Sequence, residues 1–190
     1  MKKRKLFKPN IYSHSTMARI RKFCAYRRLE RPYTRISKFK KKSYIKANPR
    51  VNIVRFAMGN TKKKFPYQLD LVTKGDLQIR QNAIESARMT CNRVLEKTLG
   101  KQAYHFKIRI YPFHILRENP LAAGAGADRF STGMKHSFGK AIGNAARVKK
   151  GQTLLSVGVN KSNINTARTA LKRAQGKLPC ACTIQVNELK

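Results

Sequence analysis

Positive charge is the feature that most limits what this chain can fold into. Its 190 residues include 43 lysines and arginines but only 8 acidic residues, so the formal net charge is +35. Such an excess destabilises a compact free protein through self-repulsion and favours a polyanionic partner. Nucleic acid is the first candidate, because neutralising phosphates releases counterions and gives strong, salt-sensitive binding. An anionic membrane surface and an acidic protein are the other partners that this charge admits.

Several other classes are excluded by what the sequence lacks. It has no run of about 18 apolar residues, so we expect no transmembrane helix. Its basic start is not followed by an apolar stretch, so we expect no secretory signal. The four cysteines, Cys24, Cys91, Cys180 and Cys182, include one C-A-C pair but match neither a zinc ligand set nor a disulfide framework. We therefore predict a reduced, metal-free cytosolic protein without a cofactor.

The first 50 residues form a strongly basic segment with eighteen lysines and arginines and a single acid, Glu30. They show no helical or strand periodicity, but aromatic residues are interleaved with the charges: Phe23, Tyr26, Tyr33, Phe39 and Tyr44. Aromatic and arginine planes can stack on bases while lysines follow phosphates. A disordered basic arm, in which the aromatics have no specific role, is the alternative, and the two interpretations are compatible.

From Val51 the pattern becomes that of a folded domain. VNIVRFAMG, residues 51–59, predicts a strand that ends in a Gly-Asn turn, and residues 67–73 alternate as a half-buried strand does. The longest helix is predicted over residues 76–99, with Asp76 as N-cap and Gly100 as C-terminal cap. Its expected apolar stripe is Ile79, Ala83, Ala87, Cys91 and Val94. Arg80, Arg88 and Arg93 surround its polar side, as a solvated face or as a surface toward RNA.

The second half of the chain repeats the alternation of strands and a helix. Residues 104–119 predict two strands with a bend at Pro112, and His105, Lys107 and Arg109 make one face basic. His105 and His114 lack an acid or cysteine partner nearby in sequence, so we interpret them as structural. Strands follow within residues 144–160 and 182–186, with a helix over 162–175 between them. Cys182, on the last of these strands, is expected to pack in the core.

These patterns predict the α+β fold class. We expect a two-layer sandwich in which two main helices pack on a mixed or antiparallel sheet, with a basic N-terminal arm and a long Gly-rich loop.

The glycine-rich span LAAGAGADRFSTGMKHSFGK, residues 121–140, needs a separate explanation. It lacks the third glycine of a dinucleotide fingerprint, and Gly139-Lys140 is followed by Ala141 rather than by Ser or Thr. Asp128 alone cannot form an acid–base pair. We therefore expect a loop whose small residues let the backbone approach a polyanion while its basic residues neutralise phosphates. A surface loop without a role is the alternative.

The same span carries a family resemblance. AGAGADRFSTGMKHSFGKAIGNAARVKKGQ resembles the signature segment of the large-ribosomal-subunit protein family numbered ten in archaea and eukaryotes and sixteen in bacteria. The motif is carried by Ala125, Gly126, Ala127, Asp128, Arg129, Gly133, Met134, Phe138, Gly139, Lys140, Gly143, Ala146, Arg147, Val148, Gly151 and Gln152. The resemblance extends over roughly residues 17–186 and favours an archaeal-type member.

This resemblance implies a non-catalytic protein of the ribosome in the cytoplasm. It implies large-subunit rRNA, A-site and P-site tRNA and neighbouring ribosomal proteins as partners, with no membrane and no small-molecule substrate. It also implies that the protein helps shape the A-site tRNA corridor near the peptidyl-transferase centre. The runner-up from another class is a free RNA- or DNA-binding module, of chaperone or chromatin type, that uses the same basic surface.

The expected sites follow from the arm, the domain and the loop. We expect residues 1–50 to be a basic extension and arm, and residues 51–190 to be a single rRNA-binding α+β domain with a loop at 119–143. The expected rRNA-binding residues are Arg27, Arg28, Arg31, Tyr33, Arg35, Arg117, Lys140 and Arg147. The expected tRNA-proximal loop residues are Gly124, Gly126, Asp128, Arg129, Gly133, Met134 and Lys135. No catalytic or metal-binding residue is expected.

Overall fold

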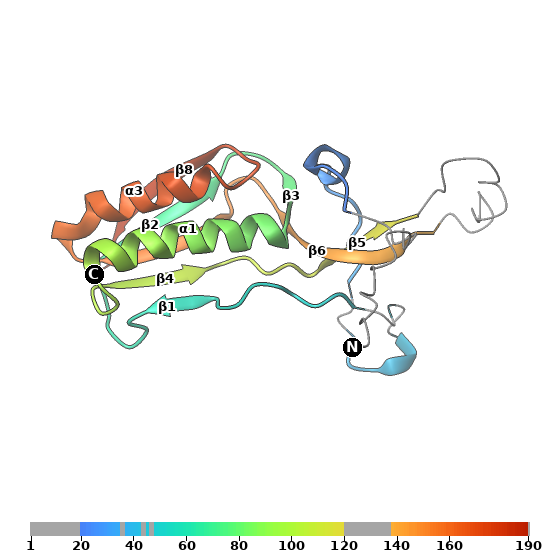
Figure 1. Cartoon of the computed structure of the whole chain (residues 1–190), viewed down its shortest axis with the longest axis horizontal. Coiled ribbons are helices and arrows are strands. Elements are labelled where there is room, and N and C mark those ends of the chain that lie inside the picture. The colour runs from blue at the N-terminus through green and yellow to red at the C-terminus, as the bar shows by residue number, and fades with distance from the viewer. Residues whose placement is uncertain (1–19, 35–36, 43–44, 46–47, 120–137, 190) are drawn as a thin grey trace, which may run out of the picture.

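The computed structural model describes residues 20–34, 37–42, 45, 48–119 and 138–189. Within them, two antiparallel sheets and two helices confirm the predicted α+β class, although the sandwich has two sheets where one was expected. The large sheet has the order β1-β4-β7-β2-β8 and the small sheet has the order β3-β6-β5. Figure 1 shows the small sheet extending from one end of the large sheet.

The large sheet is built from strands of both halves of the chain. Its members are β1 (Ala57–Gly59), β2 (Tyr67–Thr73), β4 (Tyr104–Ile108), β7 (Thr153–Val159) and β8 (Cys182–Glu188). All neighbours are antiparallel, with β2 placed between β7 and β8. The predicted strand at 51–59 is therefore shorter than expected, because only its last three residues pair with β4.

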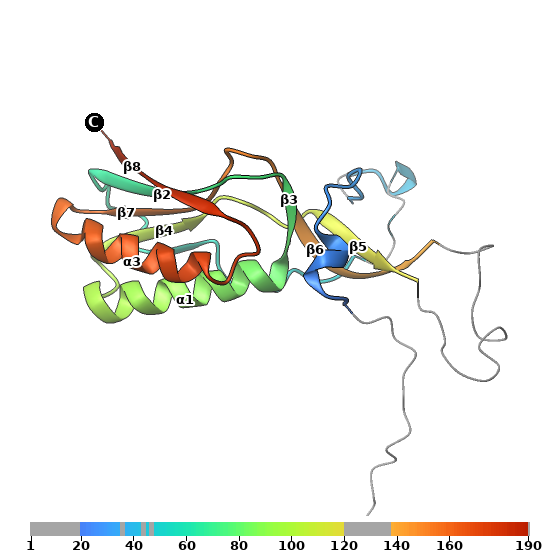
Figure 2. The ribbon, with the colours of Figure 1, turned by 90° about the horizontal axis from the view of Figure 1, so that it is seen from above.

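Both helices cover one face of the large sheet. These are α1 (Gln81–Leu99) and α3 (Ile164–Gln175), which lie beside each other in Figure 2. Their apolar stripes are buried: Ile84, Ala87, Cys91 and Leu95 on α1, and Ala167, Ala170, Leu171 and Ala174 on α3. These side chains meet Leu69, Leu71, Phe106, Leu155 and Val157 of the sheet in one core. The apolar residues that recur every three to four positions in the helices thus pack on those that recur every second position in the strands.

The beginning of α1 differs from the prediction. The helix starts at Gln81, and Leu77–Arg80 form the strand β3 instead. Strand β3 pairs with β6, Leu77 with Val148 and Arg80 with Ala145, so its backbone is satisfied by a partner far along the chain. Asp76 is consequently not an N-cap; its side chain accepts a hydrogen bond from the Lys150 amide at 2.6 Å.

The small sheet joins β3 to β5 (His114–Glu118) and β6 (Lys140–Val148). The predicted bend at Pro112 separates β4 from β5, and the structure shows that these two strands belong to different sheets. Three short 3₁₀ turns complete the elements: η1 (Phe23–Tyr26), η2 (Lys40–Lys42) and η4 (Lys161–Asn163). Tyr26 of η1 packs with Leu116 and Ala145 in a second, smaller core, which attaches the arm to the small sheet.

Two predicted helix and turn signals are confirmed by the backbone. Gly100 follows α1 with φ of 73°, and its N–H donates to the Glu96 carbonyl at 3.2 Å. Gly59 ends β1 with φ of 80°, and a Cβ built there would lie 2.2 Å from the Tyr104 carbonyl oxygen. Only glycine fits this turn, because both the backbone conformation and the space exclude a side chain.

We expect Gly59→Ala to destabilise the fold by about 3 kcal/mol or more, through strain and the clash with Tyr104. Gly75→Ala is the matched control, because its Cβ would meet nothing within 4 Å; we expect it to change stability by less than about 0.5 kcal/mol. Urea denaturation of both variants measures the difference. Equal midpoints for the two variants would contradict the close approach at Gly59.

Candidate nucleic-acid interface

The basic arm is fixed to the small sheet through its backbone. The Gln78 amide and side chain both donate to the arm, to the carbonyls of Arg27 and Arg28 respectively. Further along, the Tyr33 N–H donates to His114 Nδ1 at 3.0 Å, and the Ile115 N–H donates to the Tyr33 carbonyl at 2.8 Å. The arm backbone is therefore hydrogen-bonded to the small sheet at both ends of residues 27–33.

Three predicted arginines of the arm, Arg27, Arg28 and Arg31, are exposed to solvent. Within the described part of the chain, none of the three forms an ion pair with an acidic side chain. Backbone docking thus holds three cations at fixed spacing without neutralising them, which is the arrangement that phosphate binding needs. Arg35, also predicted here, lies outside the described residues.

A single carboxylate anchors the beginning of the arm. Glu118, at the end of β5, accepts a hydrogen bond from the Tyr26 hydroxyl at 3.2 Å and forms an ion pair with Arg21. The Arg21 amide donates in turn to the Tyr26 hydroxyl at 3.2 Å, and Arg80 Nη1 donates to the Arg21 carbonyl at 2.7 Å. The acid therefore organises the start of the arm.

Arg117 and two aromatic rings form a cluster at the end of the small sheet. The guanidinium carbon of Arg117 lies 4.4 Å from the ring centre of Tyr33 and 4.2 Å from that of Phe138. The two rings meet edge to face at 5.7 Å. Tyr33 comes from the arm, Arg117 from β5, and Phe138 from the residues just before β6. Stacked aromatic and guanidinium planes are a surface on which bases can stack.

This cluster lies beside a cavity of about 420 Å³, lined partly by Tyr26, Arg117 and Phe138. Gly139 also lines the cavity. A Cβ at this position would lie 2.7 Å from the Glu118 backbone, so the close approach of the two segments leaves no room for a side chain. Strand β5 ends at Glu118 and β6 begins at Lys140, so both ends of the predicted Gly-rich loop are held here. The predicted loop residues Gly124, Gly126, Asp128, Arg129, Gly133, Met134 and Lys135 lie outside the described residues.

The last two predicted rRNA-binding residues are both on β6. Lys140 is exposed at its first position, opposite Glu118, and the structure brings it next to the Arg117 cluster. Arg147 lies near the other end of the strand, opposite Gln78, and is half-buried. Its Nε has no hydrogen-bond partner among the described residues. The structure therefore separates Arg147 from the exposed arginines of the arm. It places Arg147 beside Gln78, whose side chain binds the arm backbone.

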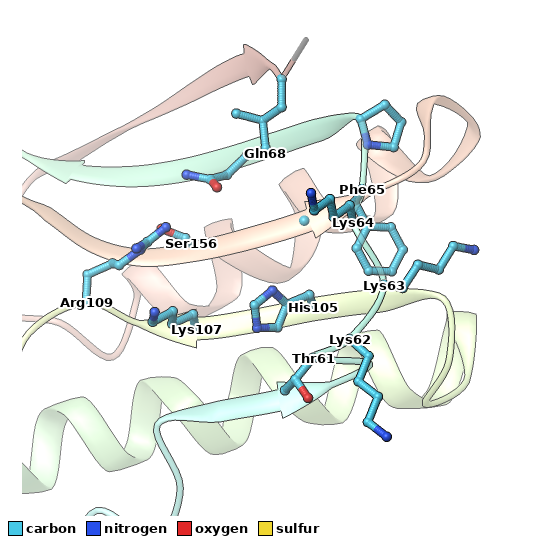
Figure 3. A pocket seen from close by; sticks show the side chains of 13 residues that line it. Thr61, Lys62, Lys63, Lys64, Phe65, Gln68, His105, Lys107, Arg109 and Ser156 are labelled. Atoms are coloured by element: carbon cyan, nitrogen blue, oxygen red, sulfur yellow. The ribbon is translucent and has the colours of Figure 1, made fainter.

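A second basic surface lies on the open face of the large sheet, opposite the helices. It comprises Lys62, Lys63, Lys64, His105, Lys107 and Arg109, which with Phe65, Gln68 and Ser156 line a hollow of about 820 Å³ (Figure 3). Alternation along β4 predicted the basic face, but the three lysines were not among the expected site residues. Their signal in the sequence is the run TKKKF.

Local contacts fix the geometry of this open face. Arg109 Nε donates to the Ser156 hydroxyl at 2.9 Å, and the ammonium of Lys63 lies 5.4 Å from the ring centre of Phe65. Burial, and then the charges of Lys107 and Arg109, lower the pKa of His105 below its ordinary value. Those two neighbouring cations oppose protonation of the ring, so the fixed charge of this face comes from lysine and arginine.

One acid, Asp70, lies on the open-face side of β2. It is 8% exposed and accepts hydrogen bonds from Gln68 at 2.9 Å and Asn187 at 3.1 Å. Side-chain amides thus satisfy this carboxylate, while the lysines around the hollow remain exposed. The surface presented by the hollow is consequently basic.

The three arginines predicted on α1 mostly serve the fold, and one of them, Arg80, lies on β3 rather than on the helix. Arg88 forms a half-buried ion pair with Glu85 at 2.6 Å, and the hydrogen bond to Glu85 raises the pKa of Arg88. Arg80 binds the arm backbone, as described above. Arg93 alone of the three is exposed. The hypothesis of an RNA-facing arginine row on α1 is therefore wrong for Arg88.

The described residues contain no cluster of three or more His, Cys, Asp or Glu side chains able to bind a metal ion. None of their helices combines the length and apolar character that crossing a membrane requires.

The chain is similar in sequence to known ribosomal proteins. The sequence profile described as "Ribosomal protein L16p/L10e" matches residues 32–185. A large ribosomal subunit protein uL16 from Methanococcus maripaludis strain S2 is 49% identical over 166 residues, covering 87% of this chain and 92% of its own. The protein of the same name from Archaeoglobus fulgidus is 45% identical over 163 residues, covering 86% and 90%.

His114 is the group through which we expect pH to act on the docking of the arm. It is 2% exposed, its Nδ1 accepts the Tyr33 N–H, and its Nε2 lies 4.0 Å from a Glu30 oxygen. Burial lowers its pKa below 6.5; Glu30 opposes this shift, whereas Arg147 and Arg117 add to it. The folded protein therefore holds the ring neutral, with the proton on Nε2.

Above about pH 6.5, His114 is neutral in both the folded and the unfolded chain, and no stability is lost. Below that pH the unfolded chain protonates His114 before the folded chain does, so the free energy of unfolding falls on acidification. We expect His114→Gln to reduce the drop in melting temperature between about pH 7.5 and about pH 5.5. His105→Gln is the comparison: burial lowers the pKa of His105 as well, so this variant removes a titrating group that makes no hydrogen bond to the arm. We expect it to reduce the drop less, because His105 is more exposed than His114. An unchanged drop in the His114 variant would refute the role of this histidine.

Proposed function

Because this chain belongs to the ribosomal protein L16p/L10e family, we propose that it is a constituent of the large ribosomal subunit that binds rRNA. The family is one of structural proteins, so the chain is not an enzyme. Its relatives are named large ribosomal subunit protein uL16. With the same role, this chain is localised in the cytoplasm, within the ribosome. Neighbouring ribosomal proteins complete its partners.

One observation carries the rRNA-binding proposal: the arm is bonded to the small sheet by its backbone while Arg27, Arg28 and Arg31 stay exposed and unneutralised. A rigid set of cations binds phosphates without the entropy cost of ordering a flexible tail. Tyr33 and Arg117 add a stacking surface next to these cations. Residues 1–50 act as the arm and residues 51–190 as the rRNA-binding domain in this proposal.

The span expected as a loop at residues 119–143, of which 140–143 belong to β6, has the finer role of shaping the A-site tRNA corridor near the peptidyl-transferase centre. What supports this role is the motif at Gly124–Lys140 and the character of its base, where Arg117, Phe138 and Lys140 gather. A base that offers cations and stacking planes suits a loop that approaches RNA from a protein scaffold. Arg129 and Lys135 would neutralise phosphates from the loop itself.

A sucrose gradient of native cell extract tests the proposed function. We expect the chain to sediment with the large subunit at low salt and after a high-salt wash, because many phosphate contacts act together with a folded interface. A bulk cytosolic protein is the control for trapping. Migration at the top of the gradient, or loss at moderate salt, would contradict an integral ribosomal role and favour the free RNA- or DNA-binding module.

The open face of the large sheet gives a separate prediction. Replacing Lys62, Lys63 and Lys64 by Gln is expected to weaken binding to large-subunit rRNA and to reduce the slope of log affinity against log salt by about 2, since each phosphate contact contributes roughly 0.7–0.9. Filter binding across a salt series measures this slope.

The control changes three exposed lysines on the helical side, Lys97, Lys172 and Lys177, to Gln. It alters the net charge equally but leaves the open face intact. Equal slopes for the two triple variants would show that only overall charge matters and would remove the open face from the interface.

A further inference from the structure

Two thiols lie side by side where α3 leads into β8, away from both basic surfaces. The Sγ atoms of Cys180 and Cys182 are 3.4 Å apart, and both cysteines are free. No third metal-ligating side chain joins them within the described part of the chain. A metal site of several ligands therefore does not account for the pair. Cys182 belongs to the core and Cys180 packs against it, but packing alone does not require the two sulfurs to face each other.

The backbone on both sides of the pair is held in place. Lys74 donates its N–H to the Ala181 carbonyl at 3.0 Å, and Gln175 Nε2 donates to the Cys182 carbonyl at 3.4 Å. Cys182 is also in register with Thr73 as the first residue of β8. The two sulfurs are thus fixed near each other, so a reaction between them needs little further ordering of the chain.

The two thiols have different surroundings. Cys180 is half-buried and reachable from solvent, whereas Cys182 is 8% exposed. The hydrogen bond with Cys182 lowers the pKa of Cys180 to about 7, although burial works in the opposite direction. The same hydrogen bond, and then burial, raise the pKa of Cys182. At neutral pH the accessible sulfur is therefore partly thiolate, and the buried sulfur keeps its proton.

We propose that Cys180 and Cys182 form a reversible intramolecular disulfide when a hydroperoxide oxidises the chain. The Cys180 thiolate attacks one oxygen of hydrogen peroxide, the O–O bond breaks, and Cys180 becomes a sulfenic acid while the leaving hydroxide takes a proton from solvent to form water. Cys182 Sγ then attacks the sulfenic sulfur, the S–O bond breaks, and the released hydroxide takes the Cys182 proton to form a second water. The two sulfurs together supply the two electrons that the peroxide accepts.

Closing the bond requires a movement of about 1.4 Å, from 3.4 Å to the disulfide length of about 2.05 Å. In a reducing compartment such a disulfide is transient, because a dithiol reverses it by exchange. Cys24 and Cys91 have no such partner: Cys24 is exposed, and Cys91 is fully buried with its pKa raised to about 12 by burial. They serve as internal references.

The test uses the reduced, full-length chain treated with equimolar hydrogen peroxide, then with iodoacetamide, and digested with trypsin. Residues 178–190 form one tryptic peptide that contains both cysteines and no other. We expect this peptide to lose two hydrogen atoms in mass, to carry no alkyl group, and to regain two alkylation sites after dithiothreitol. The Cys24 peptide is expected to show no internal disulfide.

Two serine variants assign the roles. In Cys182→Ser we expect loss of the disulfide and trapping of the Cys180 sulfenic acid by dimedone; in Cys180→Ser we expect Cys182 to remain an unmodified thiol. Full alkylation of both cysteines in the treated wild-type chain would overturn the proposal. So would conversion of Cys180 to sulfinic acid without a disulfide, and neither outcome depends on how the variants fold.

Discussion

The shortage of negative charge governs how this structure is held together. Every acid among the described residues has a partner within the chain: Glu30, Asp70, Asp76, Glu85, Glu96, Glu118 and Glu188. Two of them act at junctions, Glu118 between the arm and β5 and Asp76 between β3 and the turn after β6. Most of the described cations beyond these contacts are exposed, so the same imbalance that limits internal ion pairing creates the surface that we propose binds rRNA.

The sequence predicted those parts of the structure that depend on local pattern. The helix α3, the cap at Gly100 and the basic face of β4 follow from spacings within a few residues. The strand at Leu77–Arg80 did not, because its partner Val148 lies in the second half of the chain and overrides the local pattern. The division into two sheets was missed for the same reason.

The candidate site was predictable to a similar extent. The exposure of Arg27, Arg28 and Arg31 followed from composition, but the stack of Tyr33, Arg117 and Phe138 joins three separate segments and is visible only in the fold. Lys62–Lys64 were overlooked, since a lysine run carries no sign of which face it joins until β4 and β7 are placed beside it. The motif around Arg129 identified the family through resemblance rather than through geometry.

The order of strands also has a consequence for biosynthesis. Strand β2 spans residues 67–73, yet both its neighbours, β7 and β8, come from residues 153–188. Non-local pairing of this kind slows folding and leaves hydrogen-bonding edges open until the partners arrive. The nascent polypeptide therefore carries β2 without its partners until residues 153–188 have been synthesised, and the large sheet closes only then.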